Sequence, residues 1–315
     1  MSAPSAVFSP ALFCPTGPPA ERPAIGLAQD GLTVAQAARA IRFALTAFTS
    51  GTPGHPDTLD SCVAQTHRRA RSARADIAER QFTLVYQPVV RLADRRVRYY
   101  EALLRPRSGP VPRDFVSFAE TMGLAEELDE AVFAEILAAL RADPAVSIAV
   151  NISGLSLQSP PFRDRMLATL HAQDAELRAR LLIELTETAE IDDLPTASAT
   201  LARLRAAGIT VCIDDFGAGA ASLRYLRDLP VDIVKIDGAY VRAAATGKRD
   251  RDFLVHMLDL AHAAGAQTVA EMIETEAEAA LMAELGVTLG QGWFLGRPKE
   301  GRPGALPPDA PLGPR

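Results

Sequence analysis

Short apolar stretches alternate with longer amphipathic stretches along most of the chain. Helical patterns such as those at 125–142 and 251–265 separate stretches of strand length that are rich in branched residues. The strand candidates are Phe82–Tyr86, Val97–Leu103, Ser147–Ile152, Leu181–Leu185, Ile209–Ile213, Val231–Ile236, Gln267–Ala270 and Gly292–Leu295. Strands that alternate with helices predict an α/β domain with a mainly parallel sheet.

The same pattern divides the chain into three regions. Residues 1–75 are predicted to be flexible, because Pro, Gly, Ala and Ser dominate their beginning and the segment 50–58 is rich in turn formers. Within them, residues 32–48 predict a short amphipathic helix that docks onto the folded domain or onto a protein partner. The basic run His67–Arg74 reads as a solvated helix face. Residues 76–302 form the predicted folded domain, and the Pro-rich residues 303–315 a disordered tail.

Composition narrows the class of protein. The formal net charge of −6 and the pI near 5.5 argue against general nucleic-acid binding, which needs a basic face. Cys14, Cys62 and Cys212 are far apart and show no CxxC spacing, so neither a disulfide framework nor a thiolate metal site is expected. No apolar run has the length of a membrane span, and the first residues do not resemble a signal peptide. A reducing cytoplasm is therefore the expected location.

Polar side chains recur where the predicted strands end. In the parallel strands of a closed barrel, these ends meet on one face, which is where catalytic groups of such barrels lie. A closed (β/α) barrel is therefore favoured over an open doubly wound sheet. The residues concerned are Glu101, Asn151, Glu184, Asp214 with Asp215, Lys235, Glu271 and Gln291.

Five carboxylates in one cleft would repel one another and raise their own pKa values. Divalent cations would resolve this conflict, and carboxylates with one Asn carbonyl suit hard ions such as Mg²⁺ or Mn²⁺. The pair Asp214 and Asp215 has the chemistry to bridge two ions, the usual arrangement for phosphoester hydrolysis. Taken alone, this pair is also compatible with a turn or a helix cap.

Lys235 lies inside the apolar stretch VDIVKIDG. A buried lysine is costly unless it is paired. Beside the carboxylate cluster it would be paired, and it would also be placed to orient or polarise an attacking water. A purely structural ion pair is the alternative interpretation.

Eight motifs in order resemble the EAL-domain phosphodiesterases over about 220 residues. They are YQPVV (86–90), EALLR (101–105), VNIS (150–153), ELTE (184–187), DDFGAG (214–219), VKID (234–237), AEMIET (270–275) and QGWFLGRP (291–298). The resemblance implies a TIM-like barrel with one reversed strand. It also implies a homodimer and hydrolysis of the cyclic dinucleotide c-di-GMP to linear pGpG. Two Mg²⁺ or Mn²⁺ ions would be required, with Ca²⁺ expected to inhibit.

The resemblance also assigns roles, motif by motif. Lys235 would position the attacking water, Glu271 is the further candidate for a general base, and Gln291 would support the water and metal network. Gln87 and Arg105 would contact the substrate, and Glu187, Glu274 and Asp237 would support the loops of the site. The metal ligands would be Glu101, Asn151, Glu184, Asp214, Asp215 and Glu271.

Two motifs depart from the family pattern. The loop usually written DDFGTGYSSL reads DDFGAGAASL here, and the usual AEGVE reads AEMIE, with Met272 and Ile273 in place of Gly-Val. Neither departure removes a predicted ligand, so an active phosphodiesterase is the leading hypothesis. A weakly active or inactive c-di-GMP receptor or scaffold is the alternative. A purely protein-binding barrel is a third reading, and the complete ligand set disfavours it.

Overall fold

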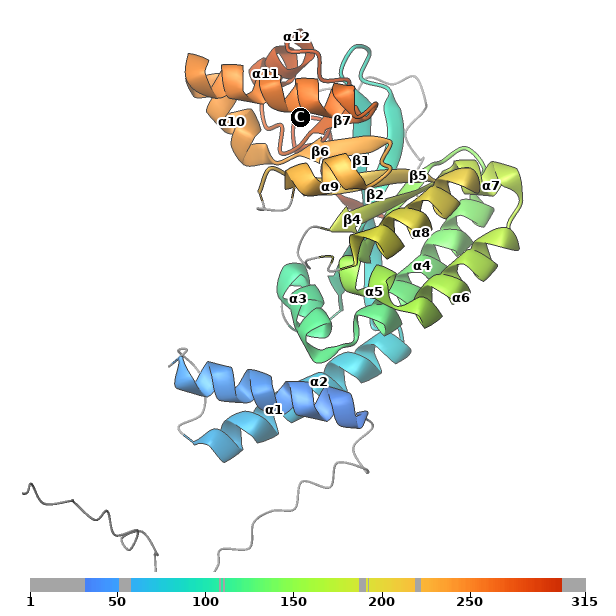
Figure 1. Ribbon diagram of the computed structural model, residues 1–315, viewed down its shortest axis with the longest axis vertical. Helices are drawn as coiled ribbons and strands as arrows, with labels where there is room; N and C mark the ends of the chain where they lie inside the picture. Colours follow the sequence, from blue (N-terminus) through green and yellow to red (C-terminus); the bar gives the residue numbers. More distant parts are fainter. Residues whose placement is uncertain are drawn as a thin grey trace, which may run out of the picture.

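A closed barrel of eight strands surrounded by helices forms most of the molecule in this computed structural model (Figure 1). The structure describes residues 32–50, 58–107, 109, 111–186, 191, 193–218 and 222–301. The predicted tail 303–315 therefore lies outside the described residues. None of the described helices is both long and apolar enough to cross a membrane.

The barrel closes because β2 pairs with β3 on one side and with β1 on the other. Pairing is parallel from β2 through β8, whereas β1 runs antiparallel to both β2 and β8. The predicted TIM-like barrel with one reversed strand is thus confirmed, and β1 is the reversed strand. The barrel strands are β1 (Phe82–Arg91), β2 (Val97–Pro106), β3 (Ile148–Ser153), β4 (Leu181–Thr186), β5 (Thr210–Phe216), β6 (Ile233–Ile236), β7 (Gln267–Ala270) and β8 (Leu289–Gly290). A short β9 (Lys299–Glu300) extends the sheet beside β1.

Helices connect the parallel strands and cover the outside of the barrel. They are α3 (Pro112–Met122), α4 (Ala125–Ala142), α5 (Gly154–Gln158), α6 (Pro160–His171), α7 (Ala175–Ala179), α8 (Leu194–Ala206), α9 (Ser222–Asp228), α10 (Gly238–Thr246), α11 (Lys248–Ala263) and α12 (Glu276–Glu284). Two further helices, α1 (Val34–Thr49) and α2 (Leu59–Ala78), lie at the opposite end of the molecule from α10, α11 and α12 (Figure 1).

The barrel interior contains one buried apolar residue from every strand. Side chains two residues apart point to the same face of a strand, so one residue per strand fills each interior layer. The layer consists of Val89, Tyr99, Ala149, Leu182, Cys212, Ile233, Val269 and Leu289. Cys212, a member of this layer, is fully buried.

The prediction of a last strand at Gly292–Leu295 is wrong. These residues form a turn in which Leu295 and Gly296 donate backbone hydrogen bonds to the Gly292 carbonyl, and the strand lies just before them at Leu289–Gly290. At Gly292, φ is +156°, and an added Cβ would lie 2.1 Å from the Ile273 carbonyl oxygen. The chain passes directly over Ile273, a close approach that an apolar run in the sequence does not reveal.

The helix predicted at 32–48 is present as α1, but the structure differs from the flexible region expected up to residue 75. Residues 59–75 belong to α2, which packs against α1 in a hairpin. Their contact is made of small residues, including Ala40, Ala44, Cys62 and Ala70, all fully buried. Alanines interspersed with arginines give a weak apolar period, which is why this helix is hard to recognise in the sequence.

The hairpin is fixed to the barrel through α3 and α4. The Phe118 ring of α3 meets Phe43 edge-on at 5.7 Å and carries the guanidinium of Arg69 on its face at 3.9 Å. On α4, Glu127 accepts hydrogen bonds from Gln36 and Arg74. Aromatic, cation–π and charged contacts therefore hold the hairpin in place.

Replacing Phe118 with alanine is expected to loosen this joint. Phe118 is 4% exposed, so the substitution should lower the free energy of unfolding by about 3–5 kcal/mol. Urea denaturation measures that loss, and limited proteolysis should detect earlier cleavage in α1 or α2. The matched control is Phe253→Ala, where the residue is 55% exposed and its ring stacks on Tyr240, and about 1 kcal/mol is expected. Equal losses in the two variants would contradict a specific role of Phe118.

Candidate active site

A ring of polar side chains forms the next interior layer above the apolar layer. Each member lies two residues further along a parallel strand, or two residues earlier on the reversed strand β1, so that all point inward at the carboxyl-terminal face. The ring consists of Gln87, Glu101, Asn151, Glu184, Asp214, Lys235, Glu271 and Gln291. The structure thus brings together the predicted strand-end residues at one face of the barrel.

Lys235 occupies the centre of this ring and is 1% exposed. Its Nζ lies within ion-pair distance of Glu101 Oε2 (3.2 Å), Glu184 Oε2 (3.1 Å), Asp214 Oδ1 (2.9 Å) and Glu271 Oε1 (2.9 Å). Four carboxylates around one ammonium leave up to three uncompensated negative charges. The ion pairs anticipated for Lys235 are therefore present, and they neutralise the cluster only in part.

Two amides hold the Glu101 carboxylate. Gln291 donates to Glu101 Oε2 at 2.6 Å, and Asn151 donates to Glu101 Oε1 at 3.1 Å. Glu101 lies in the middle of β2 rather than at its end, because β2 continues to Pro106 alongside β1. Its pairing with β3 stops at Ala102, so Glu101 is still level with the ends of the parallel strands.

Asp214 and Asp215 reach the same face because β5 is irregular at this point. The register between β5 and β6 shifts between Ile213 and Phe216, and Asp215 has a φ of +53°. Such an extra residue turns the backbone, so two consecutive side chains no longer point to opposite faces. A positive φ is unfavourable for a residue with a side chain, and strain of this kind is typical of functional sites.

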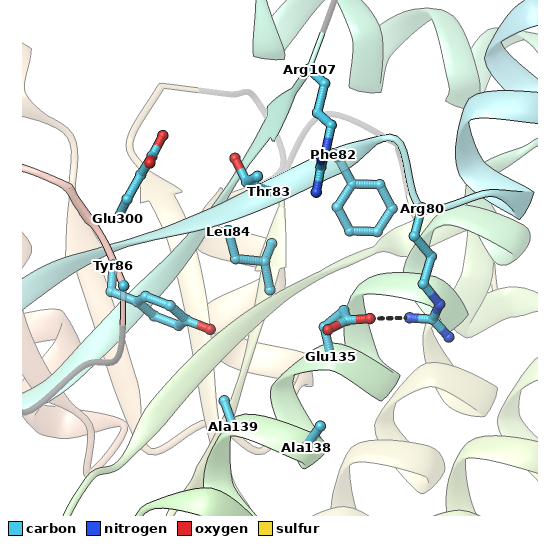
Figure 2. Close-up of a pocket in the computed structure, with 11 residues that line it drawn as sticks. Arg80, Phe82, Thr83, Leu84, Tyr86, Arg107, Glu135, Ala138, Ala139 and Glu300 are labelled. Atoms are coloured by element: carbon cyan, nitrogen blue, oxygen red, sulfur yellow. Dashed lines mark hydrogen bonds and ion pairs between the residues drawn. The ribbon is translucent and has the colours of Figure 1, made fainter.

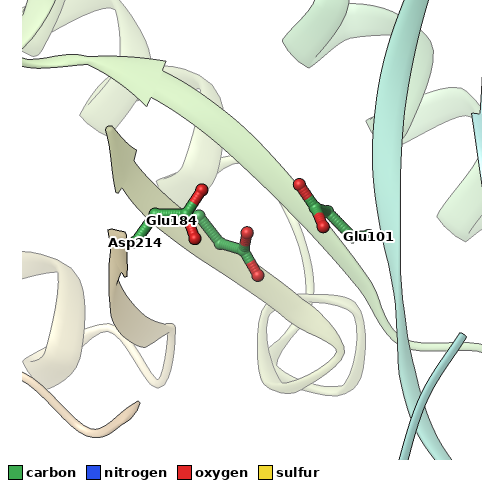
Figure 3. Close-up of side chains that lie close together, drawn as sticks. All are labelled: Glu101, Glu184 and Asp214. Atoms are coloured by element: carbon green, nitrogen blue, oxygen red, sulfur yellow. The ribbon is translucent and has the colours of Figure 1, made fainter. Parts of the chain in front are cut away.

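The carboxylates form two groups that share one member. Oxygens of Glu101, Glu184 and Asp214 lie within 4.8 Å of one another, and so do oxygens of Asp214, Asp215 and Glu271. Figure 3 shows the first group, with carboxylates from β2, β4 and β5 in close proximity. Asp214 is the member common to both groups.

The donor atoms fit a divalent hard cation. Asn151 Oδ1, Glu184 Oε1 and Gln291 Oε1 are buried and accept no hydrogen bond within the described part of the chain. Unsatisfied buried oxygens are unfavourable unless a ligand, ion or water completes them. Carboxylate and amide oxygens together with excess negative charge are the features that bind Mg²⁺ or Mn²⁺.

Burial and crowding perturb the carboxyl groups. Burial raises the pKa of Glu184 to about 8, with Glu101 and Asp214 adding to the effect and Lys235 opposing it. Burial together with Asp214 raises the pKa of Asp215 to about 6, and burial raises the pKa of Glu271 as well. The pKa of Glu101 is lowered, because the attraction of Lys235 and the amide hydrogen bonds outweigh its burial.

These shifts predict that the metal-free protein becomes less stable as pH rises from about 6 to about 8. In the folded protein Glu184 keeps its proton up to a pKa of about 8, whereas the unfolded chain releases it near pH 4. Between these values the folded state binds the additional proton, so raising the pH favours unfolding. Urea denaturation with a chelator at pH 6, 7 and 8 measures the slope. Glu184→Gln should reduce the slope but not abolish it, because the raised pKa values of Asp215 and Glu271 also contribute; stability that rises over this range in the original protein would contradict the assignment.

The two predicted substrate-contacting residues lie on the neighbouring strands β1 and β2. Gln87 is directly opposite Glu101 in the register of the two strands, and its Nε2 donates to the Gly296 carbonyl at 3.1 Å. Arg105 follows Glu101 by four residues on β2, and its Nη1 donates to the Leu104 carbonyl at 2.9 Å. Among the described residues, no carboxylate forms a salt bridge with this guanidinium.

The predicted loop-support residues have separate environments. Asp237 caps α10 by accepting a hydrogen bond from the Ala239 backbone at 2.7 Å, which fixes the loop that follows Lys235. Glu274 is exposed, and its backbone N–H donates to Glu278. Glu187 lies outside the described residues. Only Asp237 is therefore seen to support a loop of the site.

Both substituted positions of the AEMIE motif are accommodated. Ile273 is fully buried, whereas Met272 is half exposed with a φ of +55°. Space for Met272 exists because residue 238 is glycine, at which an added Cβ would lie 2.5 Å from the Met272 Cβ. Gly238 and Met272 thus fit together beside Glu271. Ala218 is exposed, and Ala220 and Ala221 lie outside the described residues.

A second group of polar residues, not predicted from the sequence, lies at the end of β3. Glu120, Asp129 and Ser153 are linked by hydrogen bonds beneath the end of β3. Asp129 lies on the buried face of α4, between Leu128 and Val132. A carboxylate within the apolar stripe of a helix was the available signal.

A separate hollow of about 510 Å³ lies between β1 and α4 (Figure 2). Phe82, Leu84 and Tyr86 of β1 line it, and the ion pair between Arg80 and Glu135 lies at its edge. These side chains alternate with the inward-facing Gln87 and Val89. The hollow therefore belongs to the opposite face of the strand and contains none of the predicted site residues.

Comparison with known proteins agrees with this geometry. The chain matches the EAL domain family over residues 70–298. It is 33% identical over 228 residues to a cyclic di-GMP phosphodiesterase of Pseudomonas aeruginosa, covering 70% of this chain and 39% of that protein. It is also 33% identical to an uncharacterized protein of Mycobacterium tuberculosis, covering 73% of this chain and 80% of the relative.

A similar solved structure is that of the PaMucR phosphodiesterase in complex with c-di-GMP. It superimposes with a TM-score of 0.64 at 31% identity, covering 74% of this chain and 98% of the other. Two further curated relatives, from Azorhizobium caulinodans and Caulobacter vibrioides, are longer, and the matched region spans 33% of each. With a family match over most of its length and the barrel that accompanies it, the chain belongs to the EAL domain family.

Proposed function

We propose that this chain is a metal-dependent phosphodiesterase that hydrolyses c-di-GMP to linear pGpG. The observation that carries the proposal is the pair of carboxylate groups sharing Asp214 within the polar ring. The similarity to a named cyclic di-GMP phosphodiesterase and to a phosphodiesterase bound to c-di-GMP supports the choice of substrate.

The proposed metal centre takes two Mg²⁺ or Mn²⁺ ions. Such ions acidify water and neutralise charge on phosphoryl oxygens. Asp214 would be the shared ligand, because it is the common member of the two groups. The full proposed ligand set is Glu101, Asn151, Glu184, Asp214, Asp215 and Glu271.

The remaining ring residues act around the reacting phosphate. Lys235 orients the attacking water through Nζ and keeps the carboxylates in place, because it contacts four of them. Glu271 accepts the proton of that water as the general base. Gln291 holds Glu101, and Arg105 binds a phosphate oxygen of the substrate through its guanidinium.

The proposal also covers the oligomeric state of the protein, its location in the cell and its inhibition by Ca²⁺. A homodimer in the cytoplasm, with Gln87 close to the substrate and Ca²⁺ acting as an inhibitor, is expected. Ca²⁺ favours longer bonds and more ligands than Mg²⁺, so it would alter the arrangement of the same carboxylates.

A hydrolysis assay tests the proposal directly. Purified protein is incubated with c-di-GMP and Mg²⁺, Mn²⁺ or Ca²⁺, and pGpG is quantified by chromatography. Product with Mg²⁺ or Mn²⁺ but not with Ca²⁺ is the expected result. Tight binding of c-di-GMP by calorimetry without any product would instead identify a receptor, and the absence of both binding and product would exclude both roles.

A further inference from the structure

Two carboxylates outside the polar ring converge on one serine at the end of β3. Ser153 Oγ donates to Glu120 Oε1 at 2.7 Å, and the Ser153 backbone N–H donates to Asp129 Oδ2 at 3.0 Å. Glu120 belongs to α3 and Asp129 to α4, so two separate helices hold the same residue. Ser153 follows Asn151 by two positions.

Capping of α5 alone does not account for this arrangement. Ser153 already caps that five-residue helix by accepting a hydrogen bond from the Leu155 backbone at 3.3 Å. Asp129 is 8% exposed, and in the described part of the chain no basic side chain forms a salt bridge with it. Burying a carboxylate in this way is costly. Because Asp129 accepts the Ser153 backbone N–H, this buried carboxylate ties the end of β3 to α4.

This attachment matters because the end of β3 has a strand neighbour on only one side. The pairing of β3 with β2 stops at Val150, whereas its pairing with β4 continues through Asn151 to Ser153. Beyond Val150, where the pairing with β2 ends, the hydrogen bonds from Ser153 to Glu120 and Asp129 hold the strand. The segment that carries Asn151 is thus held between β4 and the two helices.

The Asn151 side chain needs a fixed direction. Its Nδ2 donates to Glu101 Oε1 at 3.1 Å, and its buried Oδ1 accepts no hydrogen bond from the described residues. A small rotation of the backbone at Asn151 would move Oδ1 away from the carboxylates. Groups behind a metal ligand that orient it in this way typically affect metal affinity 10–100-fold.

We propose that Glu120 and Asp129 are positioning residues which, through Ser153, fix the end of β3 and direct Asn151 Oδ1 toward the metal centre. This inference rests on the proposed function, in which Asn151 is a metal ligand. Neither carboxylate contacts the ring itself, so their effect is transmitted through the backbone of β3.

Calorimetric titration with Mn²⁺, in the absence of substrate, tests the inference. Glu120→Ala and the milder Ser153→Ala are each expected to weaken Mn²⁺ binding by about tenfold, and Glu120→Gln, which keeps an acceptor oxygen, should restore most of the affinity. Ser153→Ala keeps the backbone bond to Asp129, so it remains informative if an Asp129→Ala variant does not fold. The matched control is Asp174→Ala. This variant removes the carboxylate that caps α7 by accepting a hydrogen bond from the Leu177 backbone N–H at 2.7 Å, and it should leave Mn²⁺ affinity unchanged.

Asn151→Ala separates this inference from the proposed function. If Asn151→Ala leaves Mn²⁺ affinity unchanged, Asn151 is not a ligand, and the proposed metal centre is wrong at that position. If Asn151→Ala weakens binding but Glu120→Ala and Ser153→Ala do not, the positioning role is overturned. In the Asn151→Ala background, Glu120→Ala should cause no further loss, because both act on the same ligand. An additional tenfold loss there would also refute the inference.

Discussion

Replacing Lys235 with methionine is expected to abolish most activity and to destabilise the metal-free protein. Methionine fills a similar volume but leaves four carboxylates without the ammonium that each of them contacts. Removing one partner of a buried ionic network costs about 3–5 kcal/mol. Losing the group that is proposed to orient the attacking water should slow hydrolysis by about 10²–10⁴-fold.

Metal ions should separate the two effects of Lys235→Met. Thermal unfolding should occur at a lower temperature in a chelator, and Mg²⁺ should restore much of the loss because it supplies the missing positive charge. Hydrolysis should stay low even when stability is restored. Lys248→Met, on the exposed first turn of α11, serves as the control and should change stability by less than about 0.5 kcal/mol. A Lys235→Met protein with normal turnover would refute the assignment.

Replacing Asp214 with asparagine should have the largest effect on metal binding. Asp214 is the common member of both carboxylate groups, so this nearly isosteric change removes a negative charge from both. Calorimetry should show loss of the two-ion stoichiometry. Hydrolysis should fall by about 10³-fold or more, corresponding to several kcal/mol of lost transition-state stabilisation.

The matched control for Asp214→Asn is Asp228→Asn on α9. Asp228 pairs with Arg227 at the surface at 2.6 Å and does not contribute to either carboxylate group. Its replacement should leave both turnover and ion stoichiometry unchanged. Two bound ions and normal turnover in Asp214→Asn would show that the shared carboxylate is not a bridging ligand.

The helices α3 and α4, which carry Glu120 and Asp129, also hold the hairpin of α1 and α2. It contacts α3 at Phe118 and α4 at Glu127, and the same helices carry Glu120 and Asp129. The helices α3 and α4 thus contact both the hairpin and the end of β3. The Mn²⁺ affinity of Phe118→Ala should therefore be measured together with its free energy of unfolding.

Local patterning was sufficient to identify seven of the eight barrel strands and most of the ring. A strand repeats every two residues, so the residue two places beyond a buried position faces the same way. Glu101, Glu184, Lys235 and Glu271 follow this rule and were found from their place after apolar stretches. Gln291 was also identified, although the strand before it was placed too late, because Gly292 turns the chain over Ile273.

Features that depend on distant parts of the chain required the tertiary structure. Gln87 joins the ring from the strand that runs in the opposite direction, which only the pairing of β1 with β2 and β8 reveals. The shift in register at β5, which turns Asp215 toward Asp214, depends on the neighbouring strand β6. The hydrogen bonds of Ser153 to Glu120 and Asp129 join residues more than twenty positions apart.

The sequence by itself therefore determined where seven of the eight barrel strands lie along the chain, most of the inward-facing polar residues and the family resemblance, since these depend on short-range periodicity and on motifs. The tertiary structure decided how the barrel closes, which carboxylates share Asp214, and where the hairpin docks. The physical reason is that alternation along a strand is a local property. Closure, register shifts and contacts between helices arise from packing between segments that the sequence keeps apart.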